Sequence, residues 1–302
     1  MSATFDAERG IWLIPCPSWN DFIREVRANP VAGERHFRGQ SDACWPLSSM
    51  WERWLIAAKQ GDKGRLVTNL GLGHNIQQVN SKLDGYLERF KSSAIGMRGG
   101  ESASLRTEDW WALARHHGMM TPLLDWTRSP YVAAFFAFAT LLESVKPLFT
   151  YGIKPIGWPQ QDVAVWEFVD CRTMGTDEGD DVSVQVDGEF QIFISRVDHA
   201  YRQKAQQGVF SKLTHEKHVD LESYLVARRM GTLLRLYTIP STELGAALGD
   251  LDLMNINYST LFPDLDGAAK HANYQEISSA LGWMHAVGFN GHGPSAFVPH
   301  KS

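Results

Sequence analysis

Cysteine is scarce in this sequence, and its placement excludes two common ways of stabilising a fold. The chain has 302 residues and three cysteines, Cys16, Cys44 and Cys171. They are odd in number, widely spaced and form no CxxC pair, which argues against a disulfide framework and a cysteine zinc site. This usage fits a reducing, cytoplasmic compartment. No secretory signal is expected, because the opening stretch MSATFDAERGIWLIP carries acids and lacks a long apolar run.

Long apolar runs and an excess of one charge are also missing. The most apolar stretch, from Tyr131 to Leu142, is too short to span a bilayer, so a soluble protein that does not enter a membrane is expected. The formal net charge of −5 and the pI near 6.1 argue against a general electrostatic attraction for nucleic acid. A local basic cleft stays open as an alternative.

Signatures of metal and nucleotide sites are absent as well. The sequence lacks HExxH, GxSxG, a C₂H₂ pattern and a GxGxxG after a strand. The adjacent His116 and His117 make a poor metal pair, because neighbouring helical residues point to different sides. Asp264 and Asp266 have no third ligand nearby, and capping the following helix is the commoner role for such acids. No metal is therefore expected.

The composition is that of a globular protein with a sizeable core. Hydrophobic residues make up 44% and charged residues 21%, and eleven tryptophans need burial. Helical spacing predicts helices at 19–28 and 107–118, and a buried apolar helix at about 129–144. Stretches rich in β-branched and aromatic residues predict strands at 163–169, 190–197 and 232–240, besides one ending at Gly39. We expect an α+β fold: one large domain with a central, mostly antiparallel sheet flanked by helices.

The stretch ARHHGMMTPLLDWTRSPYVAAFFAF, residues 114–138, gathers hydrogen-bonding side chains just before the buried helix. A loop is expected to cross from Gly118 to Ser129, which caps that helix. A helix N-terminus presents free N–H groups and partial positive charge, so it is a ready anion site that Arg128 would strengthen. Asp125 is expected to fix Arg128 or a histidine ring nitrogen. Alternatively, these polar groups bond only to one another and hold the loop.

Two further motifs carry candidate site residues. In HFRGQSD, Arg38 at a strand end can present a fork of donors to a phosphate or carboxylate, and Gly39 lets a ligand come close. The alternative is a buried Arg38 paired with an acid such as Asp125. In RQKAQQGVFSK, Gln206 and Gly208 are either ligand contacts or a helix end with its glycine cap.

Together these motifs resemble the FRG domain. HFRGQ contains the Phe-Arg-Gly triplet for which the family is named, and four motifs follow the family's order between residues 36 and 271. We therefore expect an FRG domain at 31–275, after a helical and strand lead-in at 1–30 and before a tail at 276–302. Members of the family are largely bacterial and often of unassigned function.

An Arg-Gly pair at the end of an early strand also resembles the first signature of the Arg-Ser-Glu class of ADP-ribosyltransferases. In that class the arginine helps hold NAD, and a later glutamate orients the ribose and stabilises an oxocarbenium-like transition state. The resemblance implies that Arg38 holds NAD and that Trp126 is an aromatic platform for nicotinamide. The sequence departs at the glutamate: it has no Glu-x-Glu, Gln206 stands where the glutamate is expected, and the candidate substitutes are Asp125 and Glu222.

Two functions follow from these patterns. The first is an NAD-using enzyme that transfers ADP-ribose to a protein or nucleic-acid acceptor, or hydrolyses NAD, in bacterial phage defence or toxin action. The second is a non-catalytic module that binds a nucleotide, another phosphate-bearing ligand or a partner protein. A metal-dependent hydrolase or nuclease using His117 and Asp125 has the least support from ligand spacing.

The site prediction assigns residues to three groups, with NAD as the substrate. Catalytic roles are predicted for Arg38, His117 and Asp125. The predicted ligand-binding residues are Phe37, Gly39, Gln40, His116, Thr121, Trp126, Thr127, Arg128, Ser129, Gln206 and Gly208. Asp264 and Asp266 are expected to play structural roles behind them.

Overall fold

The computed structural model describes residues 3–28, 33–54, 76–97, 105–150, 160–170, 184–186, 189–195, 201–214 and 220–286. Within these residues nine strands form one sheet, in the order β1-β2-β9-β5-β3-β4-β8-β7-β6. The strands are β1 (Thr4–Asp6), β2 (Ile11–Pro15), β3 (Glu34–Gln40), β4 (Leu123–Thr127), β5 (Asp162–Asp170), β6 (Val184–Val186), β7 (Phe190–Phe193), β8 (Gly208–Leu213) and β9 (Leu234–Pro240). Strands β2 and β9 run parallel and the other neighbours pair antiparallel, which confirms the predicted sheet.

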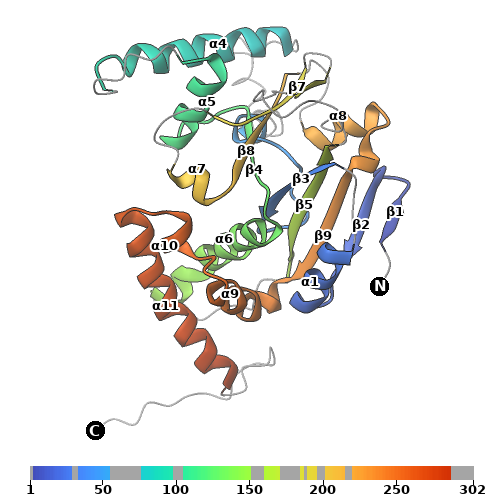
Figure 1. Ribbon diagram of the computed structural model, residues 1–302, viewed down its shortest axis with the longest axis vertical. Helices are drawn as coiled ribbons and strands as arrows, with labels where there is room; N and C mark the ends of the chain where they lie inside the picture. Colours follow the sequence, from blue (N-terminus) through green and yellow to red (C-terminus); the bar gives the residue numbers. More distant parts are fainter. Residues whose placement is uncertain are drawn as a thin grey trace, which may run out of the picture.

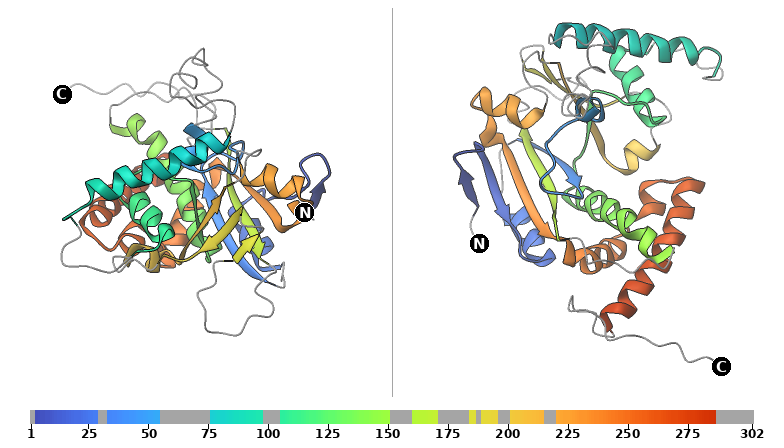
Figure 2. Two further views of the ribbon diagram at one scale, coloured as in Figure 1. Left: turned by 90° about the horizontal axis from the view of Figure 1, so that it is seen from above. Right: turned by 180° about the vertical axis from the view of Figure 1, so that it is seen from behind.

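Helices flank this sheet, as the sequence predicts. They are α1 (Trp19–Ala28), α4 (Ile76–Ser93), α5 (Thr107–His116), α6 (Pro130–Thr150), α7 (Tyr201–Ala205), α8 (Leu221–Ala227), α9 (Leu244–Leu253), α10 (Tyr258–Leu261) and α11 (Leu265–Ala286). Helices α4 and α5 lie at one end of the molecule and α9 and α11 at the other, with α6 between them (Figure 1), and the view from behind in Figure 2 shows the same arrangement. Among the described helices, none combines the length and apolar character needed to cross a bilayer.

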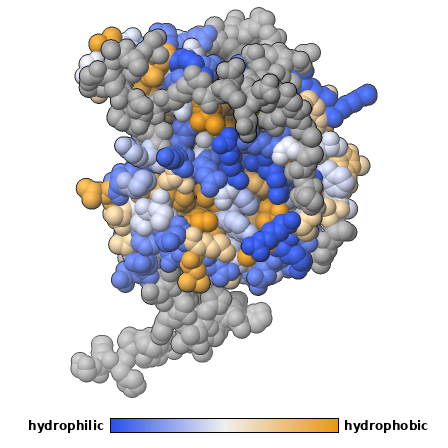
Figure 3. Space-filling view, in the orientation of Figure 1, coloured by the Kyte–Doolittle hydropathy of each residue, from blue (hydrophilic) through white to orange (hydrophobic). Residues whose placement is uncertain are grey.

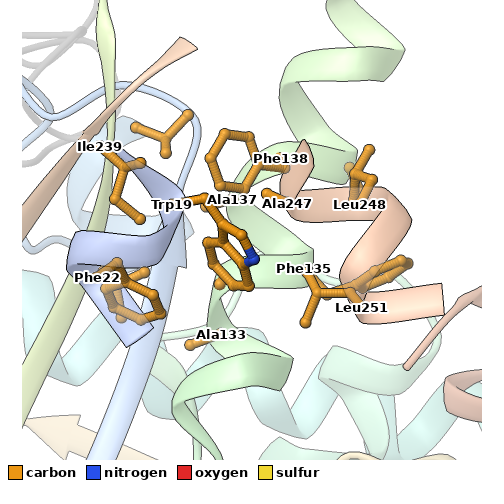
Figure 4. Close-up of a cluster of buried hydrophobic side chains, with 14 of the residues drawn as sticks. Trp19, Phe22, Ala133, Phe135, Ala137, Phe138, Ile239, Ala247, Leu248 and Leu251 are labelled. Atoms are coloured by element: carbon orange, nitrogen blue, oxygen red, sulfur yellow. The ribbon is translucent and has the colours of Figure 1, made fainter. Parts of the chain in front are cut away.

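Helix α6 is the centre of the largest apolar cluster. Ala133, Ala137 and Phe138 are fully buried, and α6 packs against the sheet, α1 and α9. Figure 4 shows Trp19 of α1 lying between Phe138 of α6 and Leu251 of α9. The predicted apolar helix is therefore confirmed. It begins at Pro130, and the Ser129 hydroxyl accepts the Val132 N–H at 3.3 Å, so Ser129 is its N-cap.

Two further apolar clusters complete the interior. The first lies on the other face of the sheet, where Trp166 and Phe168 of β5 pack with Tyr224 and Leu225 of α8. The second joins Trp111 of α5 to α4, β4 and β7. The cluster around Trp166 includes Ile11 of β2 and Leu236 of β9, so strands from both ends of the chain share it.

The structure corrects two expectations about segments. The predicted loop at 118–128 contains strand β4, which lies inside the sheet between β3 and β8. The predicted tail at 276–302 begins within α11, which continues to Ala286, and the remainder lies outside the described residues. Five residues flanked by Pro122 and Arg128 give too short a pattern to indicate a strand, so β4 depends on its two neighbours.

Candidate anion-binding site

The sheet opens between β3 and β4. These neighbours pair at one position, Phe37 opposite Thr127. By contrast, β3 pairs with β5 from Glu34 to Gln40. Arg38 follows the single paired position, and its side chain reaches across the opening, where Nη1 donates to the backbone oxygen of Asp125 at 2.8 Å.

A pocket of about 400 Å³ lies at this opening. Its size falls within the range of about 300–1,000 Å³ usual for small-molecule sites. Of the predicted site residues, those that line it are Phe37, Arg38, Gly39, His116, Asp125, Trp126, Thr127, Gln206 and Gly208. The structure thus brings together residues that are up to 171 positions apart, from Phe37 to Gly208.

An arginine cluster surrounds the one carboxylate that lines the pocket among the described residues. The Asp125 carboxylate accepts two hydrogen bonds from Arg115, to Nη2 at 2.7 Å and to Nε at 3.3 Å. Its Oδ2 also lies 3.6 Å from Nη1 of Arg38. Arg53 lies close enough to act on the charges of Arg38 and Asp125. Two guanidinium groups thus lie beside one carboxylate, and Arg53 adds a third positive charge nearby, which leaves an excess of positive charge.

The pKa values of this cluster follow from burial and from the neighbouring charges. Burial lowers the pKa of Arg38 to about 10; Asp125 opposes this effect, while Arg53 and Arg115 reinforce it. Desolvation alone would raise the pKa of Asp125, but Arg115 and Arg38 outweigh it and the pKa is lowered. Asp125 is therefore ionised at neutral pH. Among the arginines of this cluster, Arg38 is the one whose charged form is destabilised most.

The guanidinium of Arg38 also has a hydrogen-bond donor that is not used by any described residue. Its side chain is 12% exposed, and its buried Nε has no hydrogen-bond partner within the part of the chain that the structure describes. A buried guanidinium with an unused donor is costly unless an acceptor supplies the missing bond. The geometry thus favours an oxygen-rich anion beside Arg38.

Several predicted site residues lie elsewhere. Arg128 is exposed and its Nε donates to Glu34 at 2.5 Å, while His117, Thr121 and Ser129 are not among the pocket residues. The buried side chain of Gln40 binds the Pro46 oxygen and the Trp166 indole nitrogen. At the N-terminus of α6 the Ser129 hydroxyl accepts the Val132 N–H, and Arg128 pairs with Glu34.

Acids outside the pocket have structural partners. Asp264 accepts the Gly267 N–H at 2.9 Å and so caps α11, as expected for a capping acid. Asp264 and Asp266 both pair with Arg202. Glu222 accepts two hydrogen bonds from Arg9 and does not line the pocket. Among the described residues, no three histidine, cysteine, aspartate or glutamate side chains come together as metal ligands would.

Other lining residues have packing roles besides their place in the pocket. The Trp126 indole donates to Ser211 at 2.8 Å and its ring is buried among apolar side chains. A Cβ on Gly39 would lie 1.9 Å from the Ala133 oxygen, so this glycine permits β3 to lie directly against α6. The Thr127 hydroxyl donates to the Gln206 oxygen at 2.6 Å and ties β4 to the end of α7.

The sequence alone missed Arg53, Arg115, Phe136, Arg202 and Phe262. Arg115 precedes the histidine pair in the ARHH stretch, and only the packing of α5 beside β4 turns it toward Asp125. Phe136 belongs to the apolar run of α6, so nothing local distinguishes it from core residues. The chain position of Phe262 gives no sign that it meets α6.

Glu52 next to Arg53 provides a test of the local electrostatics. Burial raises the pKa of Glu52 to about 7 from 4.5. The folded state therefore holds a proton that the unfolded state has lost between about pH 4.5 and 7, and stability falls as pH rises through this range. Glu52→Gln is expected to be more stable than the original protein by about 2 kcal/mol at pH 8, with little difference at pH 4.5.

Urea unfolding of both proteins at pH 4.5 and 8 measures this effect. Glutamine keeps an acceptor for the Ser49 N–H, which now binds Glu52 Oε2 at 2.6 Å. Glu88→Gln is the matched control, because it makes the same substitution at a side chain that is 65% exposed. A stability difference that shrinks from pH 4.5 to 8 would contradict the assignment.

The comparison with known families agrees with the motifs. The family model of the FRG domain matches residues 34–145. No curated protein and no solved structure matches the chain. The matched region includes β3 with Arg38, α5 with Arg115, β4 with Asp125 and most of α6. Residues 34–145 therefore match the FRG domain, and Arg38, Arg53 and Arg115 lie inside the matched region.

Proposed function

We propose that this pocket binds a phosphate-bearing nucleotide through Arg38 and Arg115. The observation that carries the proposal is the excess of positive charge around Asp125 in a partly buried pocket. An arginine presents a planar fork of donors that matches phosphate oxygens, and such charged bonds are about twice as strong as neutral ones. A bound phosphate would accept hydrogen bonds from the guanidinium of Arg38, which lines the pocket.

NAD is the nucleotide that would give this site a chemical function. In this second proposal the bond between C1′ of the ribose and the nicotinamide nitrogen breaks, and nicotinamide leaves with the bonding electron pair. Water or a hydroxyl of a protein or nucleic-acid acceptor then bonds to C1′ and loses its proton. In this proposal the ionised Asp125 stabilises the positive charge that develops on the ribose.

The position of Arg38 on β3 favours this second proposal, through the likeness to ADP-ribosyltransferases. A bacterial enzyme of this kind would act as a defence or toxin-type effector. Two features favour the non-catalytic alternative: Asp125 is shared between Arg115 and Arg38, and Gln206 rather than a glutamate lines the pocket. No observation on the described residues favours a metal-dependent hydrolase or nuclease.

Calorimetry and mass spectrometry on the full chain distinguish these functions. Saturable binding of ADP and NAD that weakens as salt increases is expected from a cationic site. Release of nicotinamide from NAD, with and without bacterial lysate, DNA or RNA, reports catalysis. Asp125→Asn is expected to bind ADP at least as tightly, because it removes a competing anion, and to release no nicotinamide.

Each outcome identifies one function. Binding of NAD without release of nicotinamide under every condition leaves the non-catalytic nucleotide module. If neither ADP nor NAD binds to a folded protein at low salt, the proposed function is wrong.

A further inference from the structure

The pocket is also lined by aromatic and amide side chains. They are Phe136 of α6 together with Phe262, Gln203 and Gln206. Gly39 packs between the Ala133 oxygen and the Ala137 nitrogen, so Phe136 belongs to the turn of α6 that lies against the strand carrying Arg38. Figure 3 shows hydrophobic side chains gathered over α6 in the middle of this face, with hydrophilic ones around them.

Phe136 offers a face on which a ring can stack. Its contacts with Phe135 and Phe262 are both edge-like, with centroids 5.8 and 6.1 Å apart and planes at 69° and 88°. Within the described residues no aromatic ring stacks flat on Phe136, and its side chain is half-buried. An offset-stacked partner is favourable for such a ring, and nucleobases commonly take that place.

Arg202 and Phe262 form the wall of the pocket beside Phe136, and contacts within the protein hold them in place. Arg202 donates to Asp264 at 2.5 Å, and its guanidinium lies 5.5 Å from the centroid of Phe262. Asp266 adds a weaker ion pair at 3.7 Å. A wall fixed in this way loses little side-chain entropy when a ligand binds.

Two glutamine amides lead this part of the pocket to favour one kind of nucleobase. The NH₂ group of Gln203 donates to the Gly208 oxygen at 3.2 Å, and that of Gln206 donates to the Leu261 oxygen at 3.0 Å. Each of these bonds uses one of the two N–H donors of its amide, and both side chains also present a carbonyl oxygen that has no partner among the described residues. Such an acceptor suits the exocyclic amino group of adenine and disfavours a base with a carbonyl at that position.

We propose that Phe136, Gln203 and Gln206 form a base-binding subsite that selects adenine nucleotides. This inference rests on the proposed phosphate site and names its ligand class. The phosphates lie on Arg38 and Arg115, the adenine ring stacks on Phe136, and the ribose lies between them.

Calorimetry with three probes on the full chain tests the subsite. ADP and IDP differ at the amino group, and inorganic pyrophosphate lacks the base. ADP is expected to bind about tenfold more tightly than IDP and than pyrophosphate, as a lost base contact predicts. Phe136→Leu keeps an apolar side chain and is expected to lower the affinity for ADP about tenfold, with that for pyrophosphate unchanged. Gln203→Met, which does not alter α6, is expected to reduce the difference between ADP and IDP.

The possible failures are distinguishable. Equal binding of ADP, IDP and pyrophosphate, lost together in Arg38→Ala, overturns the base subsite and leaves the phosphate site standing. Absence of binding by all three probes overturns both. If Phe136→Leu does not fold, the Gln203→Met comparison decides the question, and an unchanged preference for ADP over IDP counts against the subsite.

Discussion

Replacing Arg38 with alanine is expected to weaken binding of ADP by about 10- to 100-fold, because a hydrogen bond to a charged group contributes about 1.5–3 kcal/mol. Arg38 is the most buried cation of the pocket and the one with an unused Nε among the described residues. Arg115 still neutralises Asp125 in this variant, so the protein is expected to stay folded. Calorimetry measures the affinity, and thermal unfolding checks the fold.

Two further variants show whether the charge or the shape of Arg38 matters. Arg38→Lys is expected to recover only part of the affinity, because one ammonium cannot replace the fork of donors. Arg128→Ala is the matched control from the same family motifs, since Arg128 is 47% exposed and paired with Glu34. An effect of Arg128→Ala as large as that of Arg38→Ala would place the anion at the start of α6 instead.

The contrast between these arginines shows how far the sequence predicts the site. Both stand in polar motifs beside glycine or proline, and both fit an anion site. A buried Arg38 paired with Asp125 was among the alternatives, and the structure contains this pairing across 87 positions. The direction in which the Arg128 side chain points depends on the packing of β4 beside β3. No local sequence pattern indicates this packing. The same holds for Arg115, because α5 must lie against β4 before one of its residues can face Asp125.

Some elements of the fold are likewise determined by the local sequence, and others by contacts between residues far apart in the chain. Helix α6 could be predicted because its residues are apolar on all sides and Ser129 and Pro130 suit a helix start. Strands β5 and β9 are long runs of β-branched and aromatic residues, so their type is set locally. Strand β4 has five residues and a charged centre, and it exists because Trp126 pairs with Val209 in β8, far along the chain.

The Phe-Arg-Gly triplet combines three separate tasks on alternating faces of β3. Phe37 is buried in the cluster around α6, Arg38 enters the pocket, and Gly39 again faces α6. A ligand contact was the expected reason for the glycine. The structure gives a stronger one, because the strand backbone lies against the helix backbone at this point.

Replacing Gly39 with alanine is therefore expected to destabilise the protein by about 3 kcal/mol or more, at the upper end of the cost of overpacking. The new Cβ would lie 1.9 Å from the Ala133 oxygen and 2.8 Å from the Ala137 nitrogen. Both are backbone atoms of a buried helix, so no side chain can turn aside, and β3 must move away from α6. Urea unfolding measures the loss of stability.

Gly249→Ala is the matched control for this substitution. A Cβ at Gly249 would meet nothing within 4 Å, and the residue lies inside α9, so alanine is expected to stabilise the protein by about 0.5–1 kcal/mol. Opposite signs for the same chemical change would show that contact with α6, rather than the intrinsic preference of glycine, determines the residue at position 39. If Gly39→Ala keeps its stability and loses ADP binding alone, the glycine serves the ligand and the packing explanation is wrong.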